Sequence, residues 1–301
     1  MRVVVIAGPT GTGKSELAVR LAQATGGEIV NFDSIQLYRG FDIGSAKPSA
    51  EVRSLVPHHL FDVIDADVEF NAAEYARVAR PLIEKIARPI LVGGTFFYLR
   101  ALLSGLPDMP ARDEAVRARL RRIASNSRGQ QRLHRWLSRV DPKSAAAIAP
   151  ADRHRVERAL EVWIVSGQPI SAWQRPTAET AEEIPAIKIG LSLEREPLVK
   201  SLDARVDAMY RSGLIEETRN LLTRYPAAAR PFQAIGYREA AAVVAGQMTE
   251  EAAIVETRRR TRAYAKRQMT WLRAERNVHW VNAADRDAAF ATALRLVEGE
   301  S

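Results

Sequence analysis

The chain of 301 residues is predicted to be an α/β protein in which helices flank a parallel sheet and a helical domain is inserted. Three observations predict this fold class. Short β-branched runs alternate with segments of helical periodicity, which favours parallel strands joined by helices. A glycine-rich loop links the first such run to the first helix. The middle of the chain has helical periodicity without a strand candidate.

The first part of the chain alternates strands with helices. Residues 3–6 are a β-branched run, Val-Val-Val-Ile, which is typical of a strand buried on both faces. After the glycine-rich loop, the spacing of apolar residues over 16–24 predicts the first helix. The later elements expected in this part are a strand at 28–30, a polar loop at 40–48, a helix at 71–87, a strand at 89–92 and a helix at 96–103.

A stretch rich in glycine and proline at 105–110 interrupts this alternation. Residues 112–174 combine helical periodicity with many arginines, so we expect a helical insertion over 109–182. The α/β core then comprises residues 1–108 and 183–301. Its second part is expected to contain a strand at 187–193, helices at 195–224, 237–245 and 250–275, a strand at 279–281 and a helix at 286–298.

Composition and charge narrow the functional classes. The chain has a net charge of +8 and no cysteine, which excludes disulfides and cysteine-ligated zinc and fits a cytoplasmic protein. No apolar run approaches the roughly 20 residues of a membrane span, and the apolar N-terminus is expected to be a buried strand and not a signal peptide. The positive charge favours a polyanionic partner, with an arginine-rich solvated surface as the alternative.

The strongest motif is the glycine-rich loop, which fits G-x-x-x-x-G-K-[ST] in full between a strand and a helix. Glycines let backbone amides point at phosphate oxygens, and the helix N-terminus adds partial positive charge. Lys14 is expected to reach the outer phosphates and the Ser15 hydroxyl to ligate Mg²⁺. A turn without a ligand is the alternative. The predicted phosphate-binding residues are Gly8, Pro9, Thr10, Gly11, Thr12, Gly13, Lys14 and Ser15.

An acidic residue follows a different strand from the one that an ATPase or GTPase would use. In those enzymes a second strand usually ends in an aspartate that holds the metal ion. The strand expected at 89–92 ends instead in Gly93, Gly94 and Thr95, whereas the strand at 28–30 leads to Asp33. Ligands bind at the carboxyl ends of parallel strands. Asp33 is therefore expected to face the loop, either as a magnesium holder or as a base.

Several segments, in order along nearly the whole chain, resemble the bacterial tRNA dimethylallyltransferases, also called tRNA isopentenyltransferases. They are GPTGTGKS (8–15), NFDSIQLYRGFDIGSAKPS (31–49), LVGGTFFYLRALLSGL (91–106), RVERALEVW with SGQPIS (155–171), RVDAMYRSGLIEE (205–217), QAIGYRE (233–239) and AKRQMTWLR (265–273). The combination of D-S-x-Q-x-Y, G-G-T-x-x-Y and K-R-Q-x-T-W-L-R is specific, whereas many families share the phosphate loop. The loop has Gly-Thr where Ala-Ser is common in the family, and no cysteine is present for the zinc-binding extension of many eukaryotic relatives.

This resemblance implies a P-loop NTPase-like fold and transfer of the dimethylallyl group of dimethylallyl diphosphate to N6 of adenosine 37, beside the tRNA anticodon. The loop would then hold a leaving diphosphate and not a nucleotide such as ATP. Asp33 would accept the N6 proton; a magnesium-holding or helix-capping role is the alternative. Lys14, Thr95 and Arg205 would stabilise the diphosphate together with Mg²⁺. The alternatives are a plain helix cap for Thr95 and a surface position for Arg205.

The resemblance also implies RNA contacts. Ser34 and Gln36 would hydrogen-bond the edge of an unstacked base, unless they make local turn bonds. Arg155 and Arg158 would share a helix face in the insertion, which is expected to clamp the anticodon stem-loop from one side. The implied tRNA-binding positions are Asp33, Ser34, Ile35, Gln36, Thr95, Arg117, His154, Arg155, Val156, Glu157, Arg158, Gln233, Ala234, Ile235, Gly236, Tyr237, Arg238, Lys266, Arg267, Gln268, Met269, Thr270, Trp271, Leu272 and Arg273.

A cationic stripe is expected on the helix near 250–275. At 3.6 residues per turn its basic side chains fall within an arc about 80° wide, which suits a phosphate backbone. A solvated amphipathic helix is the alternative. The basic residues of the stripe are Arg258, Arg262, Lys266 and Arg273, and the residues expected to pack on the core opposite them are Tyr264, Trp271 and Leu272.

Three other functions stay open from the residues alone. A small-molecule kinase or NTPase would turn over ATP or GTP. An isopentenyltransferase acting on free AMP or ADP would not need an RNA-sized basic face, and a non-catalytic RNA-binding protein would not need Asp33. The adjacent His58 and His59 are expected to be one packed and one exposed residue and not metal ligands, because no third ligand is spaced to join them. A monomer is expected.

Overall fold

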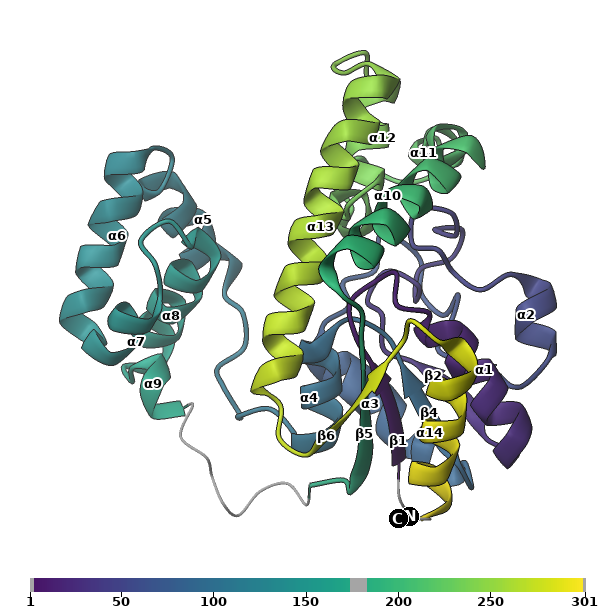
Figure 1. The fold of residues 1–301 in the computed structure, drawn as a ribbon. Coiled ribbons are helices and arrows are strands. Elements are labelled where there is room, and N and C mark those ends of the chain that lie inside the picture. The colour runs from purple at the N-terminus through teal and green to yellow at the C-terminus, as the bar shows by residue number, and fades with distance from the viewer. Residues whose placement is uncertain (1–2, 174–182, 300–301) are drawn as a thin grey trace. The chain divides into compact units, whose positions relative to one another are not determined.

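The computed structural model describes residues 3–173 and 183–299 (Figure 1). A six-stranded sheet forms its core, with the order β3-β2-β4-β1-β5-β6, and neighbouring strands are parallel throughout. The strands are β1 (Val3–Ala7), β2 (Glu28–Asn31), β3 (His58–His59), β4 (Pro89–Val92), β5 (Ala186–Ser192) and β6 (Val278–Asn282). Strand β1 is fully buried, in line with its β-branched run. The predicted parallel α/β sheet is confirmed.

Helices cover both faces of the sheet (Figure 1). On one face, α1 (Lys14–Thr25) and α14 (Arg286–Glu298) join a core cluster with side chains of β1, β2, β4 and β5. On the other face, α3 (Ala72–Lys85) packs against α4 (Phe96–Ser104), and Tyr75 stacks on Tyr98 with ring centroids 5.0 Å apart. Burying both faces explains why the central strands β1 and β4 are continuous apolar runs.

A second cluster of helices lies above the carboxyl ends of the strands (Figure 1). It consists of α10 (Arg195–Arg211), α11 (Leu214–Leu222), the 3₁₀ helix η1 (Arg230–Gln233), α12 (Tyr237–Val244) and α13 (Glu250–Ala274). The segment after β2 packs into this cluster, where the Phe41 ring lies 5.2 Å from the Phe232 ring and 4.9 Å from the Tyr237 ring. These contacts fix the loop that follows Asp33 against the helices that carry Arg205 and Gln268.

The insertion is a separate compact unit, Leu106–Glu182, and the rest of the chain forms the other unit. Its described residues contain helices and no strand: α5 (Glu114–Ile123), α6 (Ser127–Val140), α7 (Pro142–Ala147), α8 (Arg153–Ser166) and α9 (Ile170–Trp173). Leu120, Leu133, Leu137 and Leu160 are central to its hydrophobic core. This unit begins three residues before the expected start at residue 109 and ends at the expected residue 182.

Three elements differ from the sequence-based expectation. The helix expected over 195–224 is two helices, because Gly213 adopts a left-handed conformation (φ 94°) between α10 and α11. The short helix α2 (Ala50–Ser54) and the strand β3 were not expected. A five-residue helix and a two-residue edge strand carry too little periodicity to be recognised. Nowhere in residues 3–173 and 183–299 does a helix combine the length and apolar character needed to cross a bilayer.

Candidate functional site

A cavity of about 590 Å³ opens in the α/β core at the carboxyl ends of the strands. The phosphate loop supplies Gly11 and Lys14, the segment after β2 supplies Asp33, and α10 supplies Arg205. Helix α13 closes the cavity with Tyr264 and Gln268, among other residues. Residues that are far apart in the sequence therefore meet in one pocket, as ligand sites do in open α/β sheets.

Side chains fix the shape of the phosphate loop by hydrogen bonds to its carbonyl groups. Lys14 Nζ and Thr12 Oγ1 each donate to the Pro9 carbonyl at 2.9 Å. From outside the loop, Ser201 Oγ donates to the Gly11 carbonyl and an Arg286 guanidinium nitrogen to the Thr12 carbonyl, both at 2.9 Å. With these carbonyls engaged, the loop amides are the donors that it presents to phosphate oxygens.

Left-handed glycines explain the tight path of the loop. Gly11 (φ 83°) and Gly13 (φ 80°) adopt a conformation that side chains with a Cβ rarely reach. Gly13 immediately precedes α1, so the helix N-terminus lies at the cavity, where its partial positive charge favours an anion. The side chain of Ser15 is exposed at this first turn and lines the cavity.

Lys14, Arg205 and Asp33 form an electrostatically coupled group at the cavity. Burial, and then the positive charge of Arg205, lower the pKa of Lys14 to about 7, while Asp33 acts in the opposite direction. Burial also lowers the pKa of Arg205, again against the effect of Asp33. Two cations beside one carboxylate are the arrangement expected where a polyanionic ligand supplies the remaining negative charge.

Asn31 holds Asp33 in place at the end of β2. The fully buried Asn31 side chain accepts from the Asp33 amide at 2.8 Å and donates to the Leu60 carbonyl at 2.9 Å. The Asp33 carboxylate accepts from the Ile35 amide at 2.9 Å, which orients it. The sequence contains a signal for this hydrogen bond, because β2 ends in an asparagine two residues before Asp33, but the signal was missed.

Thr95 and Ser34 face each other across the cavity wall. The Ser34 amide donates to Thr95 Oγ1 at 3.0 Å, and the Thr95 hydroxyl donates to Ser34 Oγ at 3.2 Å. Thr95 stands at the N-cap of α4 but makes no side-chain capping bond, so the structure does not support the plain helix-cap alternative. These contacts tie the end of β4 to the segment that carries Asp33.

Gln268 connects the phosphate loop to the end of β4. Its side chain is nearly fully buried; its carbonyl oxygen accepts from the Thr10 amide at 2.9 Å and its amide donates to the Gly94 carbonyl at 3.0 Å. Tyr264, expected to pack on the core, lines the cavity instead, and its hydroxyl donates to the same Gly94 carbonyl at 3.2 Å. Burial, and then the nearby Asp33, raise the pKa of Tyr264.

Ser15 and Asp33 could hold a magnesium ion together with a phosphate ligand. Both line the cavity and offer the hard oxygen atoms that Mg²⁺ prefers. Among the described residues there is no group of three or more His, Cys, Asp or Glu side chains that could bind a metal by themselves. Mg²⁺ is commonly held by one or two protein oxygens plus phosphate oxygens, so this donor set fits a metal that arrives with diphosphate.

The expected base-contacting and RNA-contacting residues are only partly brought together. Gln36, Gln233 and Arg267 line the same cavity as Asp33. So do Ser34, Ile35, Ala234 and Ile235. His154, Arg155, Arg238, Lys266, Thr270 and Arg273 are exposed, Met269 and Trp271 are half-buried, and Gly236 adopts a positive φ as the N-cap of α12.

Several of these residues are buried in the free protein. They are Val156, Glu157, Tyr237, Leu272 and Gln268, of which Gln268 lines the cavity. Leu272 packs on the core as expected, while the half-buried Trp271 has the Arg100 guanidinium 5.5 Å from its ring centroid. The family motif therefore mixes contact positions with structural ones.

Two arginines of the insertion form ion pairs with a buried carboxylate. Glu161 is fully buried and accepts from Arg117 Nε and from an Arg158 guanidinium nitrogen, both at 2.8 Å. Burial raises the pKa of Glu161, but Arg117 and Arg158 outweigh this effect and hold it below its usual range. These two expected tRNA-contacting arginines therefore form a structural ion-pair network with Glu161 in the free protein.

The expected stripe on α13 is also partly neutralised. Arg258 pairs with Asp207 and Arg262 pairs with Asp203, both on α10. These salt bridges fasten α13 to α10, and sequence periodicity on one helix cannot reveal a counter-charge on another. Lys266 and Arg273 remain exposed, and they have no ion-pair partner within the described ranges.

Comparison with known proteins places this chain in a family. A family model described as IPP transferase matches residues 36–275. The tRNA dimethylallyltransferase of Geobacter sulfurreducens is 46% identical over 285 residues, covering 93% of this chain and 91% of that protein. The solved structure of the tRNA isopentenylpyrophosphate transferase of Bacillus halodurans superposes with a TM-score of 0.73 at 38% identity, covering 99% of this chain and 96% of that one.

A more distant structure has the same fold. It is a eukaryotic dimethylallyltransferase described as acting on tRNA, with a TM-score of 0.77 at 27% identity, and the match covers all of this chain and 80% of that one. The P-loop NTPase-like fold and the order of the motifs agree with these relatives. The chain therefore belongs to the IPP transferase family.

Proposed function

We propose that the protein is a tRNA dimethylallyltransferase. It transfers the dimethylallyl group of dimethylallyl diphosphate to N6 of adenosine 37 in tRNA and releases diphosphate. The observation that carries this proposal is the meeting of Asp33 with Lys14 and other residues of the phosphate loop in one cavity, in a chain of this family. The volume of about 590 Å³ is within the range of small-molecule sites.

Asp33 acts as the base in this reaction. The N6 lone pair attacks the first carbon of the dimethylallyl group, the bond from that carbon to the diphosphate oxygen breaks, and the N6 proton passes to Asp33. A positioned base contributes roughly 10²–10⁴-fold. Asn31 holds the backbone of Asp33 at the end of β2 and the Ile35 amide orients its carboxylate, which supports this role because a proton acceptor must be aimed before the bond forms.

The phosphate loop and its neighbours stabilise the leaving diphosphate. Lys14, Arg205 and the loop amides surround the place where negative charge grows, and preorganised donors of this kind contribute roughly 3 kcal/mol each. Thr95 supplies a hydroxyl beside the same wall. When bound, Mg²⁺ held by Ser15 and the diphosphate would neutralise part of this charge.

The positive surface serves tRNA binding. The target base must leave the stack of the anticodon loop to enter the cavity, at a cost of a few kcal/mol. Exposed Lys266 and Arg273 on α13, and exposed His154 and Arg155 on the insertion, would contact phosphates and offset this cost. We place the reaction in the cytoplasm and propose that a monomer carries it out.

Transfer of labelled dimethylallyl to an anticodon stem-loop tests the proposal. The expected result is one labelled N6 in the RNA with adenosine 37, no product when guanosine replaces it, and far less product with free AMP. Product from AMP alone would favour a transferase of free nucleotides, and ATP hydrolysis without transfer would favour an NTPase. Absence of product with the adenosine 37 RNA would overturn the proposal.

A further inference from the structure

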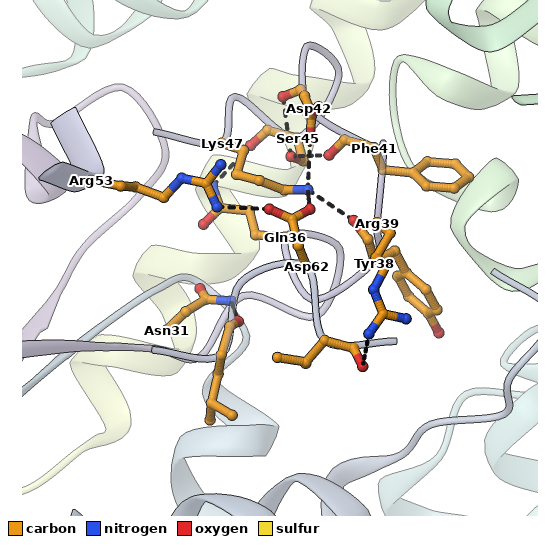
Figure 2. A network of polar contacts seen from close by, with 12 residues as sticks. Asn31, Gln36, Tyr38, Arg39, Phe41, Asp42, Ser45, Lys47, Arg53 and Asp62 are labelled. Carbon is orange, nitrogen blue, oxygen red and sulfur yellow. Dashed lines mark hydrogen bonds and ion pairs between the residues drawn. The ribbon is translucent and has the colours of Figure 1, made fainter. Parts of the chain in front are cut away.

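A buried lysine outside the catalytic group organises the loop beside the cavity. The Lys47 side chain is only 1% exposed, and its ammonium donates to the Tyr38 carbonyl at 2.8 Å, to Asp42 at 2.6 Å and to Asp62 at 2.5 Å. Figure 2 shows these partners converging on the Lys47 nitrogen, Tyr38 and Asp42 from the loop after β2 and Asp62 from the segment after β3. A buried ammonium is stable only with such partners, so Lys47 holds these segments together.

The charges of this network balance. Arg53 donates to the second carboxylate oxygen of Asp62 at 2.7 Å, so two cations face two carboxylates. Ala46 (φ 47°) and Asp62 (φ 54°) adopt left-handed conformations that residues with a Cβ rarely take. Surrounding contacts must hold such conformations, and the Lys47 network lies beside both of them.

The same loop fixes the orientation of Gln36. The Gln36 side-chain amide donates to the Ser45 carbonyl at 3.1 Å (Figure 2) and to the Ala46 carbonyl at 3.2 Å, and Ala46 directly precedes Lys47. Both partners are acceptors, so the Gln36 nitrogen must face them and its oxygen is the atom left for a ligand. Gln36, Ser45 and Ala46 all line the cavity that contains Asp33.

We propose that Lys47 is a positioning residue that sets the choice of adenine over guanine by holding Gln36 as a hydrogen-bond acceptor. The inference rests on the proposed function. At the exocyclic position adenine presents an N6 donor, which the Gln36 oxygen can accept, whereas guanine presents an O6 acceptor, which that oxygen repels. If the loop is released, the Gln36 amide can rotate and present its nitrogen instead, and the preference is lost.

The test measures binding of two anticodon stem-loops that differ only in carrying A or G at position 37. We expect the wild-type protein to prefer the A37 RNA by about 10- to 100-fold. Lys47→Met should reduce this ratio to about 3-fold or less, and Lys47→Arg, which keeps the charge, should restore part of it. The matched control is Lys188→Met, since Lys188 forms a half-buried ion pair with Glu275 away from the cavity lining.

Pyrophosphate affinity separates a local effect from loss of the fold. It should stay within about 2-fold of wild type in Lys47→Met, because the phosphate loop is not part of the network. If Lys47→Met does not fold, Asp42→Asn neutralises one partner of the ammonium and should lower the A37 preference in the same direction. An unchanged ratio in the folded Lys47 or Asp42 variant, or a wild-type protein without preference, overturns the inference. Absence of dimethylallyl transfer would overturn the proposed function instead, while the binding ratio still decides this inference.

A second, independent observation concerns the surface of the insertion. In α6 the exposed residues Arg128, Arg132, Arg135 and Arg139 are spaced 4, 3 and 4 apart. On a helix they fall within an arc about 60° wide. Helix α6 contains no acidic residue, and none of the four arginines has an ion-pair partner within the described parts of the chain. They differ in this from Arg117 and Arg158, which are paired with Glu161.

We infer that this arginine stripe binds the phosphate backbone of a tRNA stem. The stripe extends over about 16 Å along the helix axis, long enough to meet several phosphates. Leu133 and Leu137 on the opposite side of α6 are buried in the core of the insertion, so the helix presents the stripe rigidly. A neutral or basic partner would have no reason to prefer this surface, whereas a polyanion does.

The experiment compares Arg132→Gln/Arg135→Gln with Arg77→Gln/Arg219→Gln, which removes two exposed arginines that pair with glutamates on the core. Affinity for full-length tRNA should fall about 10-fold in the stripe variant, and the slope of log K against log salt should decrease by about 2. The control variant should change neither quantity. Equal affinity and slope in the two variants would overturn this inference, whatever the outcome of the transfer assay.

Discussion

Replacing Gly94 by alanine tests whether Gln268 holds the phosphate loop. Gly94 does not adopt a positive φ, so the backbone accepts alanine there, but the new methyl group would overlap the amide nitrogen of Gln268. Nothing else around Gly94 comes closer than ordinary van der Waals contact. The substitution therefore acts through one side chain, which would be pushed away from Thr10.

The magnitude follows from the bonds that Gln268 makes. Displacing it leaves the Thr10 amide without its acceptor, which costs about 1–3 kcal/mol. The Gly94 carbonyl keeps the Tyr264 hydroxyl and so loses less. Replacing glycine by alanine restricts the unfolded chain and contributes about 0.4–1 kcal/mol in the opposite direction. We expect Gly94→Ala to destabilise the core by ~1–2 kcal/mol and to weaken pyrophosphate binding, because the loop is less well preorganised.

A double-mutant cycle gives the decisive comparison. In Gln268→Ala the obstructing side chain is already gone, so adding Gly94→Ala should be neutral or stabilising by up to about 1 kcal/mol. Urea unfolding measures the free energy, taking the transition that pyrophosphate shifts as the one that reports the core. If Gly94→Ala destabilises the protein equally in both backgrounds, Gln268 does not transmit the effect and the account of the loop is wrong.

Three further predictions concern ionisation and loop support. Because Lys14 has a pKa of about 7 in the free protein and must be charged to bind diphosphate, the Kd of pyrophosphate should rise up to tenfold per pH unit from pH 8 to 9.5; calorimetry should find little dependence in Lys14→Arg. Glu161→Gln should destabilise the insertion by ~3 kcal/mol at pH 7 in urea unfolding. Since the pKa of Glu161 is lowered, its contribution is complete above the ordinary glutamate pKa and is lost as pH falls through the lowered value, so the variant should show the shallower acid dependence. Arg286→Ala should raise KM for dimethylallyl diphosphate several-fold with little change in kcat, because Arg286 donates to the Thr12 carbonyl of the phosphate loop. Arg286→Lys should recover part of the lost affinity. An unchanged KM in Arg286→Ala would contradict this role of Arg286.

The sequence predicted the α/β core well because its signals are local and repeated. Buried β-branched runs, helical spacing and a complete phosphate motif identify strands, helices and loop without knowledge of tertiary contacts. The break at Gly213 was missed, since a glycine between two helical patterns is tolerated as often as it ends a helix. Asp33 was also predicted to lie in the site, because it follows a strand and ligands bind at the carboxyl ends of parallel strands.

The parts of the site that could not be predicted depend on pairing across long sequence separations. Gln268 contacts Thr10, 258 residues away, and Arg262 is paired with Asp203 on another helix. Lys47 was one polar residue in an expected loop, and only its burial with two aspartates distinguishes it. No periodicity or spacing rule encodes such contacts, so buried support and exposed contact positions look alike in the sequence.

The most direct measurement is the single-turnover rate of dimethylallyl transfer by Asp33→Asn, with substrate affinities determined on the same samples. A neutral amide of the same shape can still accept from the Ile35 amide through its oxygen, and Asn31 still holds the backbone, but the amide cannot accept the N6 proton. We predict a loss of about 10²–10⁴-fold in rate, while the Kd values for tRNA and dimethylallyl diphosphate stay within a few-fold of wild type. A variant that transfers at a rate within tenfold of wild type would contradict the role given to this carboxylate.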